Sequence, residues 1–273
     1  MKQMENAQIK ECSLQVLKAL RSVCQANGLR YSLTGGSLIG AVRHQGFIPW
    51  DDDIDIMMPR PDYDRLVQIV GKGDYGFDLH CVELEGEAYP YPFAKACCRG
   101  TRVVEQAARE GSVPLGVFVD IFPVDGAGNR YGFSRFRVMC FQFLHGLKIT
   151  ANWTRFQRSK LRKWYYEPFR YFCYLLSRVL GQKRLNRQLD RFLRAKSYAK
   201  SAYAGRLVGD YGSREVMPKG IFETYIPVTF EGEEFSAIAD YDTFLSRLFG
   251  DYMQLPPKEK QVSHHDFRAY WVE

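Results

Sequence analysis

The stretch Gly35–Asp55, GGSLIGAVRHQGFIPWDDDID, joins a Gly-Gly-Ser turn to four aspartates within five positions. These aspartates are Asp51, Asp52, Asp53 and Asp55. The apolar residues IMM at 56–58 predict that the aspartates lead into a partly buried strand. Side chains on a strand alternate between its faces, so Asp53 and Asp55 are expected to point to the same side. Two carboxylates held side by side repel each other unless a cation lies between them.

The acidic strand therefore predicts a site for a divalent cation. Carboxylate oxygens suit Mg²⁺, with Mn²⁺ as the alternative, and Mg²⁺ also binds the oxygens of a substrate phosphate. The competing interpretation is an acidic surface turn in which Asp51 or Asp52 caps a neighbouring element. The strand-like, apolar character of Ile54, Ile56 and Met57 favours the cation site over a solvated loop.

The Gly-Gly-Ser element predicts a phosphate contact. Residues Leu29–Leu33 indicate a short strand, and a helix is expected to begin at Ser37. A glycine-rich turn between them lets the backbone N–H groups of Gly35, Gly36 and Ser37 approach a phosphate. Arg43 and His44 follow in the same helix and are further candidates for contact with a phosphate or an acceptor.

Two later strands carry single charged residues. Val117–Phe122 is an apolar run around Asp120, and a lone buried carboxylate needs a cation or a hydrogen-bond network. If this strand lies beside the acidic strand, Asp120 completes a cluster of three carboxylates and is the best candidate for the catalytic base. Lys95 lies in the predicted strand 93–98 and either reaches a phosphate or remains a surface lysine. Asp125 is expected to serve the turn into Gly126.

The residues from 35 to 66, GGSLIGAVRHQGFIPWDDDIDIMMPRPDYDRL, resemble the signature of the LicD family. Further blocks resemble the family at Tyr91–Lys95 with Thr101, at Val119–Asp125 (VDIFPVD) and at Gly250–His265 (GDYMQLPP…HH). The middle of the chain, roughly 130 to 205, carries no distinctive match.

This resemblance implies a fold, a site and an activity. The fold would be α+β, a small mixed β-sheet flanked by helices in the nucleotidyltransferase manner. Asp53, Asp55 and Asp120 would be the metal ligands. One of the adjacent histidines, His264 or His265, would approach the active cleft, with His265 as the candidate for substrate contact. The family transfers phosphocholine from CDP-choline to cell-surface glycans such as teichoic acid or lipopolysaccharide, and fukutin-related sugar-phosphate transferases are distant relatives. The alternatives are transfer of a nucleotide or sugar phosphate, or a non-catalytic protein that binds membranes or glycans.

Composition agrees with a folded enzyme of 273 residues. Seven cysteines with no C-x-x-C pair indicate reduced thiols and a cytoplasmic location. Charged residues interrupt the first 11 positions, which argues against a signal peptide, and no apolar run is long enough for a membrane span.

Basic charge is concentrated in residues 130–206. This segment holds 19 lysines and arginines against two acids, Glu167 and Asp190, a net charge of +17, so the remainder of the +7 chain carries −10. Its helical, aromatic pattern predicts a helical insertion (130–206) between a catalytic core (1–129) and a C-terminal hairpin and helix (207–273) that pack on that core. Three interpretations remain open for the insertion: a solvated basic face, a surface for anionic lipid at the inner face of the cytoplasmic membrane, or, less favoured, a nucleic-acid surface. The interfacial residues expected for the lipid surface are Trp153, Trp164, Tyr165, Tyr166 and Phe169.

Overall fold

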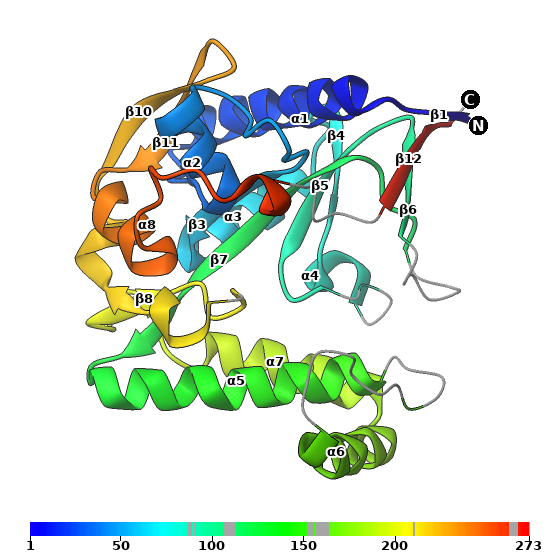
Figure 1. Ribbon diagram of the computed structural model, residues 1–273, viewed down its shortest axis with the longest axis vertical. Helices are drawn as coiled ribbons and strands as arrows, with labels where there is room; N and C mark the ends of the chain where they lie inside the picture. Colours follow the sequence, from blue (N-terminus) through cyan, green and yellow to red (C-terminus); the bar gives the residue numbers. More distant parts are fainter. Residues whose placement is uncertain are drawn as a thin grey trace.

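A mixed β-sheet forms the centre of the protein in a computed structural model (Figure 1). The structure describes residues 1–86, 89, 91–105, 113–151, 156, 164–209, 211–261 and 267–272. The strands follow one another across the sheet in the order β2 (Ser32–Leu33), β3 (Ile54–Pro59), β7 (Phe118–Gly128), β5 (Ala94–Cys98) and β4 (Phe77–His80). Strands β3 and β7 are parallel, whereas the other pairs are antiparallel. The predicted mixed architecture is confirmed.

Strand alternation divides the sheet into an apolar face and a charged row. In register across β3, β7 and β5, Ile54 lies beside Val119, and Val119 lies beside Ala96. These three side chains belong to the main hydrophobic core and are fully buried. Since neighbouring positions on a strand face opposite sides, the residues between the core positions point away from this core. That second row is charged.

Helices α1 (Asn6–Asn27) and α3 (Arg60–Val70) pack against the sheet. Helix α1 presents apolar residues at helical spacing, and Leu17 and Leu20 are buried in the core. It ends at Gly28, whose positive φ of 60° closes the helix. Helix α2 (Gly35–His44) contacts β3 and leads the chain back towards it.

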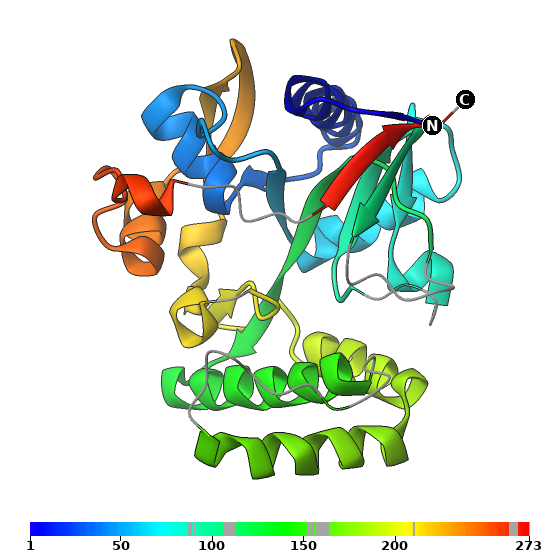
Figure 2. The same ribbon diagram turned by 45° about the vertical axis from the view of Figure 1, so that its right-hand side comes forward.

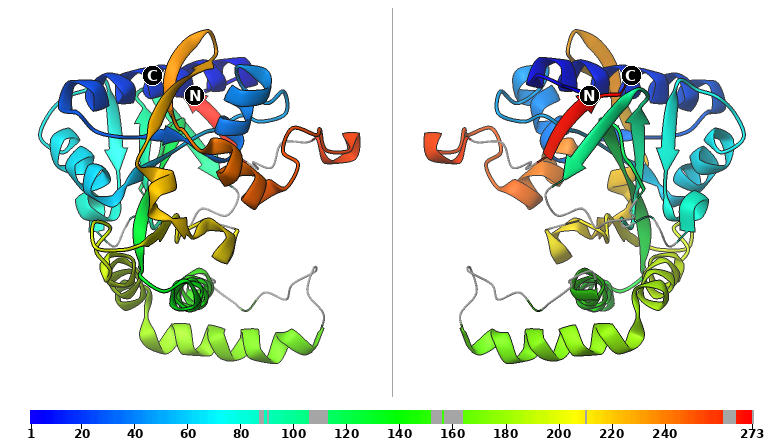
Figure 3. Two further views of the ribbon diagram at one scale, coloured as in Figure 1. Left: turned by 90° about the vertical axis from the view of Figure 1, so that its left-hand side faces the viewer. Right: turned by 90° about the vertical axis from the view of Figure 1, so that its right-hand side faces the viewer.

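The described residues of the predicted helical insertion form α5 (Tyr131–Ala151), α6 (Glu167–Leu180) and α7 (Gln182–Arg194). Helices α5 and α7 pack at the end of β7, where Val138, Phe141, Leu189 and Leu193 form a second core with Ala127 of the strand. Figures 1 and 2 show these helices at one end of the molecule, with α1 at the other. Helix α6 is the outermost of the three and crosses α5 on the side away from the sheet (Figure 3).

The C-terminal segment returns to the core. The predicted hairpin forms from β10 (Tyr225–Phe230) and β11 (Glu233–Ile238), and α8 (Tyr241–Phe249) follows it. Strands β8 (Tyr203–Gly205) and β9 (Met217–Pro218) extend the sheet from the end of β7. Strand β12 (Phe267–Trp271) then pairs with β6 (Thr101–Glu105) and β1 (Lys2–Gln3), so the two termini lie together (Figure 1).

Strand β4 stops at His80, and residues Val82–Glu85 form the short helix α4. Two local predictions from the sequence are wrong. Helix α2 begins at Gly35 and not at Ser37, because Thr34 has extended backbone and serves as its N-cap residue. Asp125 does not serve a turn: β7 continues to Gly128, and the buried Asp125 carboxylate accepts two hydrogen bonds from the Arg60 guanidinium, at 2.6 and 2.9 Å.

All seven cysteines are free thiols. Across the described ranges, no helix combines the length and the apolar character that crossing a bilayer requires.

Candidate active site

A row of three charged side chains crosses the centre of the sheet. Asp55 of β3 lies in register with Asp120 of β7, and Asp120 lies in register with Lys95 of β5. The strand that carries Asp120 therefore lies beside the acidic strand, as the sequence predicted. The Lys95 ammonium donates a hydrogen bond to Asp120, with 2.6 Å between Nζ and Oδ1. Both residues are buried, so the ion pair is shielded from water.

Aromatic rings surround the Lys95 ammonium. Its Nζ lies 3.3 Å from the ring centroid of Phe118, 4.6 Å from that of Tyr91 and 5.4 Å from that of Phe93. Aromatic faces attract a cation, and these rings also exclude water from its surroundings. The rings thus keep the Lys95 ammonium away from water, and the ammonium points at the carboxylate of Asp120.

Negative charge is crowded at the N-terminal end of β3. Burial and the neighbouring Asp120 raise the pKa of Asp55 to about 7, against the opposing effects of Arg206 and Lys95. Burial and the charges of Asp55 and Asp51 raise the pKa of Asp53 well above its ordinary value. Desolvation and like charges both disfavour the ionised carboxylates. The site therefore holds more negative charge than its own cations neutralise.

The Gly-Gly-Ser element packs directly on these carboxylates. A Cβ atom at Gly35 would lie 3.1 Å from Asp55 Oδ2, and one at Gly36 would lie 2.3 Å from Asp51 Oδ2. Ser37 Oγ accepts a hydrogen bond of 2.8 Å from the backbone N–H of Asp55. The N-terminus of α2 thus faces the acidic cluster, where its dipole favours negative charge. Gly35, Gly36 and Ser37 position the aspartates, and contact with a substrate phosphate stays a prediction.

Two other candidates, Arg43 and His44, are not brought to this cluster. Arg43 and His44 lie in the last turn of α2, about 12 Å along the helix from Gly36. There the Arg43 guanidinium donates to the carbonyl oxygen of Tyr252 at 2.7 Å and to His44 Nε2 at 2.9 Å. His265 lies outside the described residues.

Sequence reasoning missed Arg206. Its buried guanidinium makes two hydrogen bonds to Glu215, at 3.0 and 2.9 Å, and its charge lowers the pKa of Asp55. It follows β8 directly and lies over the ring of Phe122. The sequence offered no signal for this role, because Arg206 is one of many basic residues in the segment 130–206. Asp51 is a further residue of the acidic cluster, because its charge contributes to the raised pKa of Asp53. Its position in the run of aspartates at 51–55 is the sequence signal that indicates this.

The donor set fits a divalent cation in its chemistry. In the part of the chain that the structure describes, no group of three histidine, cysteine, aspartate or glutamate side chains is arranged as a metal-binding site. Asp120 is bound to Lys95 instead. Asp53, Asp55 and Asp120 nevertheless supply the hard oxygen donors that Mg²⁺ selects, and burial together with the neighbouring carboxylates raises the pKa values of Asp53 and Asp55.

Comparison with known proteins is consistent with this arrangement. Residues 28–172 match the LicD/FKTN/FKRP nucleotidyltransferase domain. The chain is 30% identical over 265 residues to the lipopolysaccharide cholinephosphotransferase LicD of Haemophilus influenzae, an alignment that covers 94% of each chain. The ribitol 5-phosphate transferases FKRP of mouse and human are 44% identical over 62 residues, which is 20% of this chain and 13% and 12% of theirs.

The matched domain contains β3, β5 and β7, and so includes the whole charged row of Asp55, Asp120 and Lys95. The match and the full-length similarity together identify the protein: this chain belongs to the LicD family and is a transferase of phosphorus-containing groups.

Proposed function

We propose that this protein transfers phosphocholine, or a similar phospho-alcohol, from a CDP-linked donor to a hydroxyl of a cell-surface glycan or its lipid-linked precursor. The observation that carries the proposal is the charged row in which Asp55, Asp120 and Lys95 meet on three adjacent strands. The similarity over nearly the whole chain to a lipopolysaccharide cholinephosphotransferase supports the choice of choline phosphate.

In this reaction the acceptor hydroxyl attacks the phosphorus that carries choline. The bond from that phosphorus to the bridging oxygen of the diphosphate breaks, and CMP leaves. Asp120 takes the proton of the hydroxyl, and Lys95 fixes the position of the Asp120 carboxylate through their hydrogen bond. Because phosphoryl transfer requires little covalent work from the protein, positioning and charge neutralisation supply most of the rate.

We propose Mg²⁺, with Mn²⁺ as a substitute, as the cofactor of this site. When bound, it would neutralise the charge of the donor diphosphate next to the carboxylates. Asp53, Asp55 and Asp120 would hold it, while Gly35, Gly36 and Ser37 keep the N-terminus of α2 against the acidic cluster. The ordinary repulsion between these carboxylates would then become a source of binding affinity for the cation.

A second candidate keeps the same site but transfers a nucleotide or a sugar phosphate. The short similarity to the ribitol 5-phosphate transferases FKRP favours considering it. A third candidate, a non-catalytic membrane or glycan-binding protein, is disfavoured because the acidic residues Asp53, Asp55 and Asp120 are all present.

The test incubates the protein with Mg²⁺ and a panel of CDP-alcohols, with and without teichoic acid, lipopolysaccharide or capsule acceptors, and follows CMP release. We expect CMP release that depends on acceptor and metal and is lost in Asp120→Asn. Release of pyrophosphate from a nucleoside triphosphate would support the second candidate instead. Binding of glycan with no turnover across the whole panel would support the third.

We propose a cytoplasmic location, peripheral at the inner face of the cytoplasmic membrane. A lipid-linked acceptor would require the enzyme to work at the bilayer surface, and the net charge of +17 in residues 130–206 would suit an anionic surface.

A further inference from the structure

Helix α6 exposes an apolar face to solvent. Phe172, Leu175 and Val179 lie on one side of it and are 58%, 47% and 84% exposed. The opposite side packs inward through Cys173 and Ser177, which are buried. A surface helix normally turns its polar residues outward. The exposed apolar side of α6 therefore indicates a surface that another molecule covers.

Helix α5 adds a second exposed apolar row. Phe136, Met139 and Phe143 follow one another at helical spacing and are 59%, 64% and 43% exposed. The next position of this row, Leu147, is buried and belongs to the core that α5 shares with Cys173 of α6. Helix α6 therefore covers only the C-terminal part of the row and leaves the rest uncovered.

The two exposed rows meet. The rings of Phe143 of α5 and Phe169 of α6 lie 6.4 Å apart between centroids, and both are largely exposed. The α5–α6 apolar surface is defined by Phe136, Met139, Phe143, Phe169, Phe172, Leu175 and Val179. Figure 3 shows α6 at the outer edge of the molecule, and no other helix or strand of the described residues lies beyond it.

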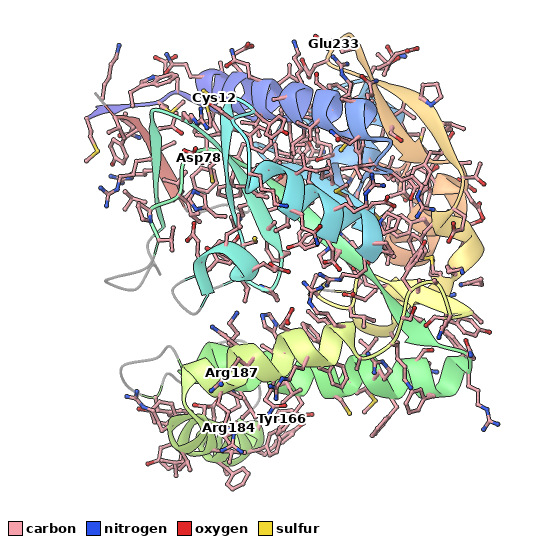
Figure 4. All side chains as sticks on the ribbon, turned by 180° about the vertical axis from the view of Figure 1, so that it is seen from behind. Cys12, Asp78, Tyr166, Arg184, Arg187 and Glu233 are labelled. Carbon is pink, nitrogen blue, oxygen red and sulfur yellow. The ribbon has the colours of Figure 1, made fainter. Side chains whose placement is uncertain are left out.

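Exposed arginines lie on α6 and on the helix α7 that packs against it. Helix α7 turns Arg184, Arg187 and Arg191 outward at helical spacing, and Arg178 is exposed on α6 itself. Seen from behind, Arg184 and Arg187 lie at the end of the molecule that carries α6 and α7 (Figure 4). The two acids of the segment 130–206, Glu167 and Asp190, pair with arginines of their own helices.

We propose that the α5–α6 apolar surface, with its arginines, docks on an anionic lipid bilayer. Exposed aliphatic and aromatic side chains enter the headgroup boundary while arginines contact anionic headgroups, the pattern of an interfacial helix. A nucleic acid would use stacking rings but would gain little from Met139, Leu175 and Val179. A second copy of the chain would bring two strongly basic surfaces together, and their repulsion opposes that contact.

This inference does not depend on the phosphotransfer proposal. Among the interfacial residues that the sequence predicts for a lipid surface, Tyr165, Tyr166 and Phe169 are exposed. Trp153 and the side chain of Trp164 lie outside the described residues.

The test is co-sedimentation of the full chain with vesicles of phosphatidylcholine alone or mixed with phosphatidylglycerol. We expect binding to the mixed vesicles that weakens as salt rises, and much weaker binding to phosphatidylcholine alone. The double variant Phe172→Glu with Val179→Glu should lose most of this binding. Its control, Met253→Glu with Leu255→Glu, changes two exposed apolar residues elsewhere and should bind like the wild type.

A second pair of variants tests the charge. Arg184→Gln with Arg187→Gln should weaken binding by about fivefold for each arginine and reduce its salt dependence. The control Lys72→Gln with Lys258→Gln removes two exposed charges that lie outside α5, α6 and α7, and it should not change vesicle binding. Thermal melting should show that all four proteins are folded, since the changed residues are exposed.

Three results would overturn the proposal. They are no binding of the wild type to anionic vesicles at low salt, unchanged binding of the variant carrying both Phe172→Glu and Val179→Glu, or a dimer by light scattering that this variant converts to monomer. CMP release with a soluble acceptor separates a failure of the membrane-docking proposal from a failure of the proposed activity. The variant carrying both Phe172→Glu and Val179→Glu should retain this CMP release.

Discussion

Lys95 and Asp120 lie directly opposite each other on antiparallel strands β5 and β7, and the ammonium of the first donates to the carboxylate of the second at 2.6 Å. Both side chains are buried. This pair fixes one end of the charged row, while at the other end burial and the neighbouring Asp120 raise the pKa of Asp55. Lys95 thus neutralises Asp120 on one side of the row, whereas on the other side Asp120 and Asp55 repel each other.

Replacing Lys95 should be severe for stability and activity together. Lys95→Met leaves the Asp120 carboxylate buried beside Asp55 without its ammonium, and removing one partner of a buried pair costs about 3–5 kcal/mol. We expect a lower melting temperature by calorimetry and loss of CMP release. Lys148→Met is the matched control, because Lys148 is equally buried but lies outside the site. A Lys95→Met protein as stable as the wild type would show that the ion pair does not hold this row.

Replacing Asp55 should separate stability from activity. Its pKa is about 7 when folded and about 3.9 when unfolded, so the folded state binds more protons between these values and the stability of the wild type falls as pH rises through that window. Asp55→Asn removes this loss. In metal-free buffer, the variant should melt close to the wild type near pH 4 and several degrees higher at pH 8. With Mg²⁺ and substrates supplied, it should show no turnover.

The control for Asp55 is Asp251→Asn, an exposed carboxylate outside the site, which should melt like the wild type at both pH values. If Asp55→Asn instead destabilised the protein at pH 8, repulsion among the carboxylates would not be the dominant interaction at this position.

Mg²⁺ should stabilise the wild type by binding its carboxylates. A ligand that binds only the folded state raises stability by RT ln(1 + [L]/Kd), so the melting temperature should rise with Mg²⁺ concentration. The rise should be absent in Asp55→Asn and unaffected in Asp251→Asn. Equal Mg²⁺ dependence in Asp55→Asn and the wild type would remove the proposed cation site.

Gly35 and Gly28 offer a matched test of the close packing at the acidic cluster. Both have positive φ, 56° and 60°, so alanine should cost each about 1–2 kcal/mol in backbone strain. A Cβ at Gly35 would also lie 3.1 Å from Asp55 Oδ2, whereas one at Gly28 meets nothing within 4 Å. We expect similar melting temperatures for Gly35→Ala and Gly28→Ala, with loss of activity only in Gly35→Ala. Equal activity in the two variants would contradict the packing role of Gly35.

Lys148 should make stability depend on alkaline pH. It lines a cavity of about 20 Å³ with Arg60, Glu83 and Asp190, and burial lowers its pKa to about 8. An unfolded lysine keeps its proton to about pH 10.4, so the unfolded state binds more protons between these values and stability rises with pH there. Lys148→Met should therefore raise the melting temperature most below pH 8, with the gain shrinking towards pH 10. A gain that is constant with pH would mean that Lys148 carries no such penalty.

The sequence by itself determined the elements and the chemistry of the site. The apolar residues around Asp55 and Asp120 predicted two strands that carry acidic side chains, and the helical spacing of 131–200 predicted the insertion. These are local patterns: a period of two or of 3.6 residues is carried by each segment alone.

Only the tertiary structure decided which segments meet. It paired Lys95 with Asp120, placed Arg206 near Asp55, put Arg43 at the far end of α2 and bound Asp125 to Arg60. Strand order and the direction of long side chains depend on how the whole chain buries its apolar surface, and residues far apart in sequence contribute to that energy together. For this reason the sequence could name the charged groups but not their partners.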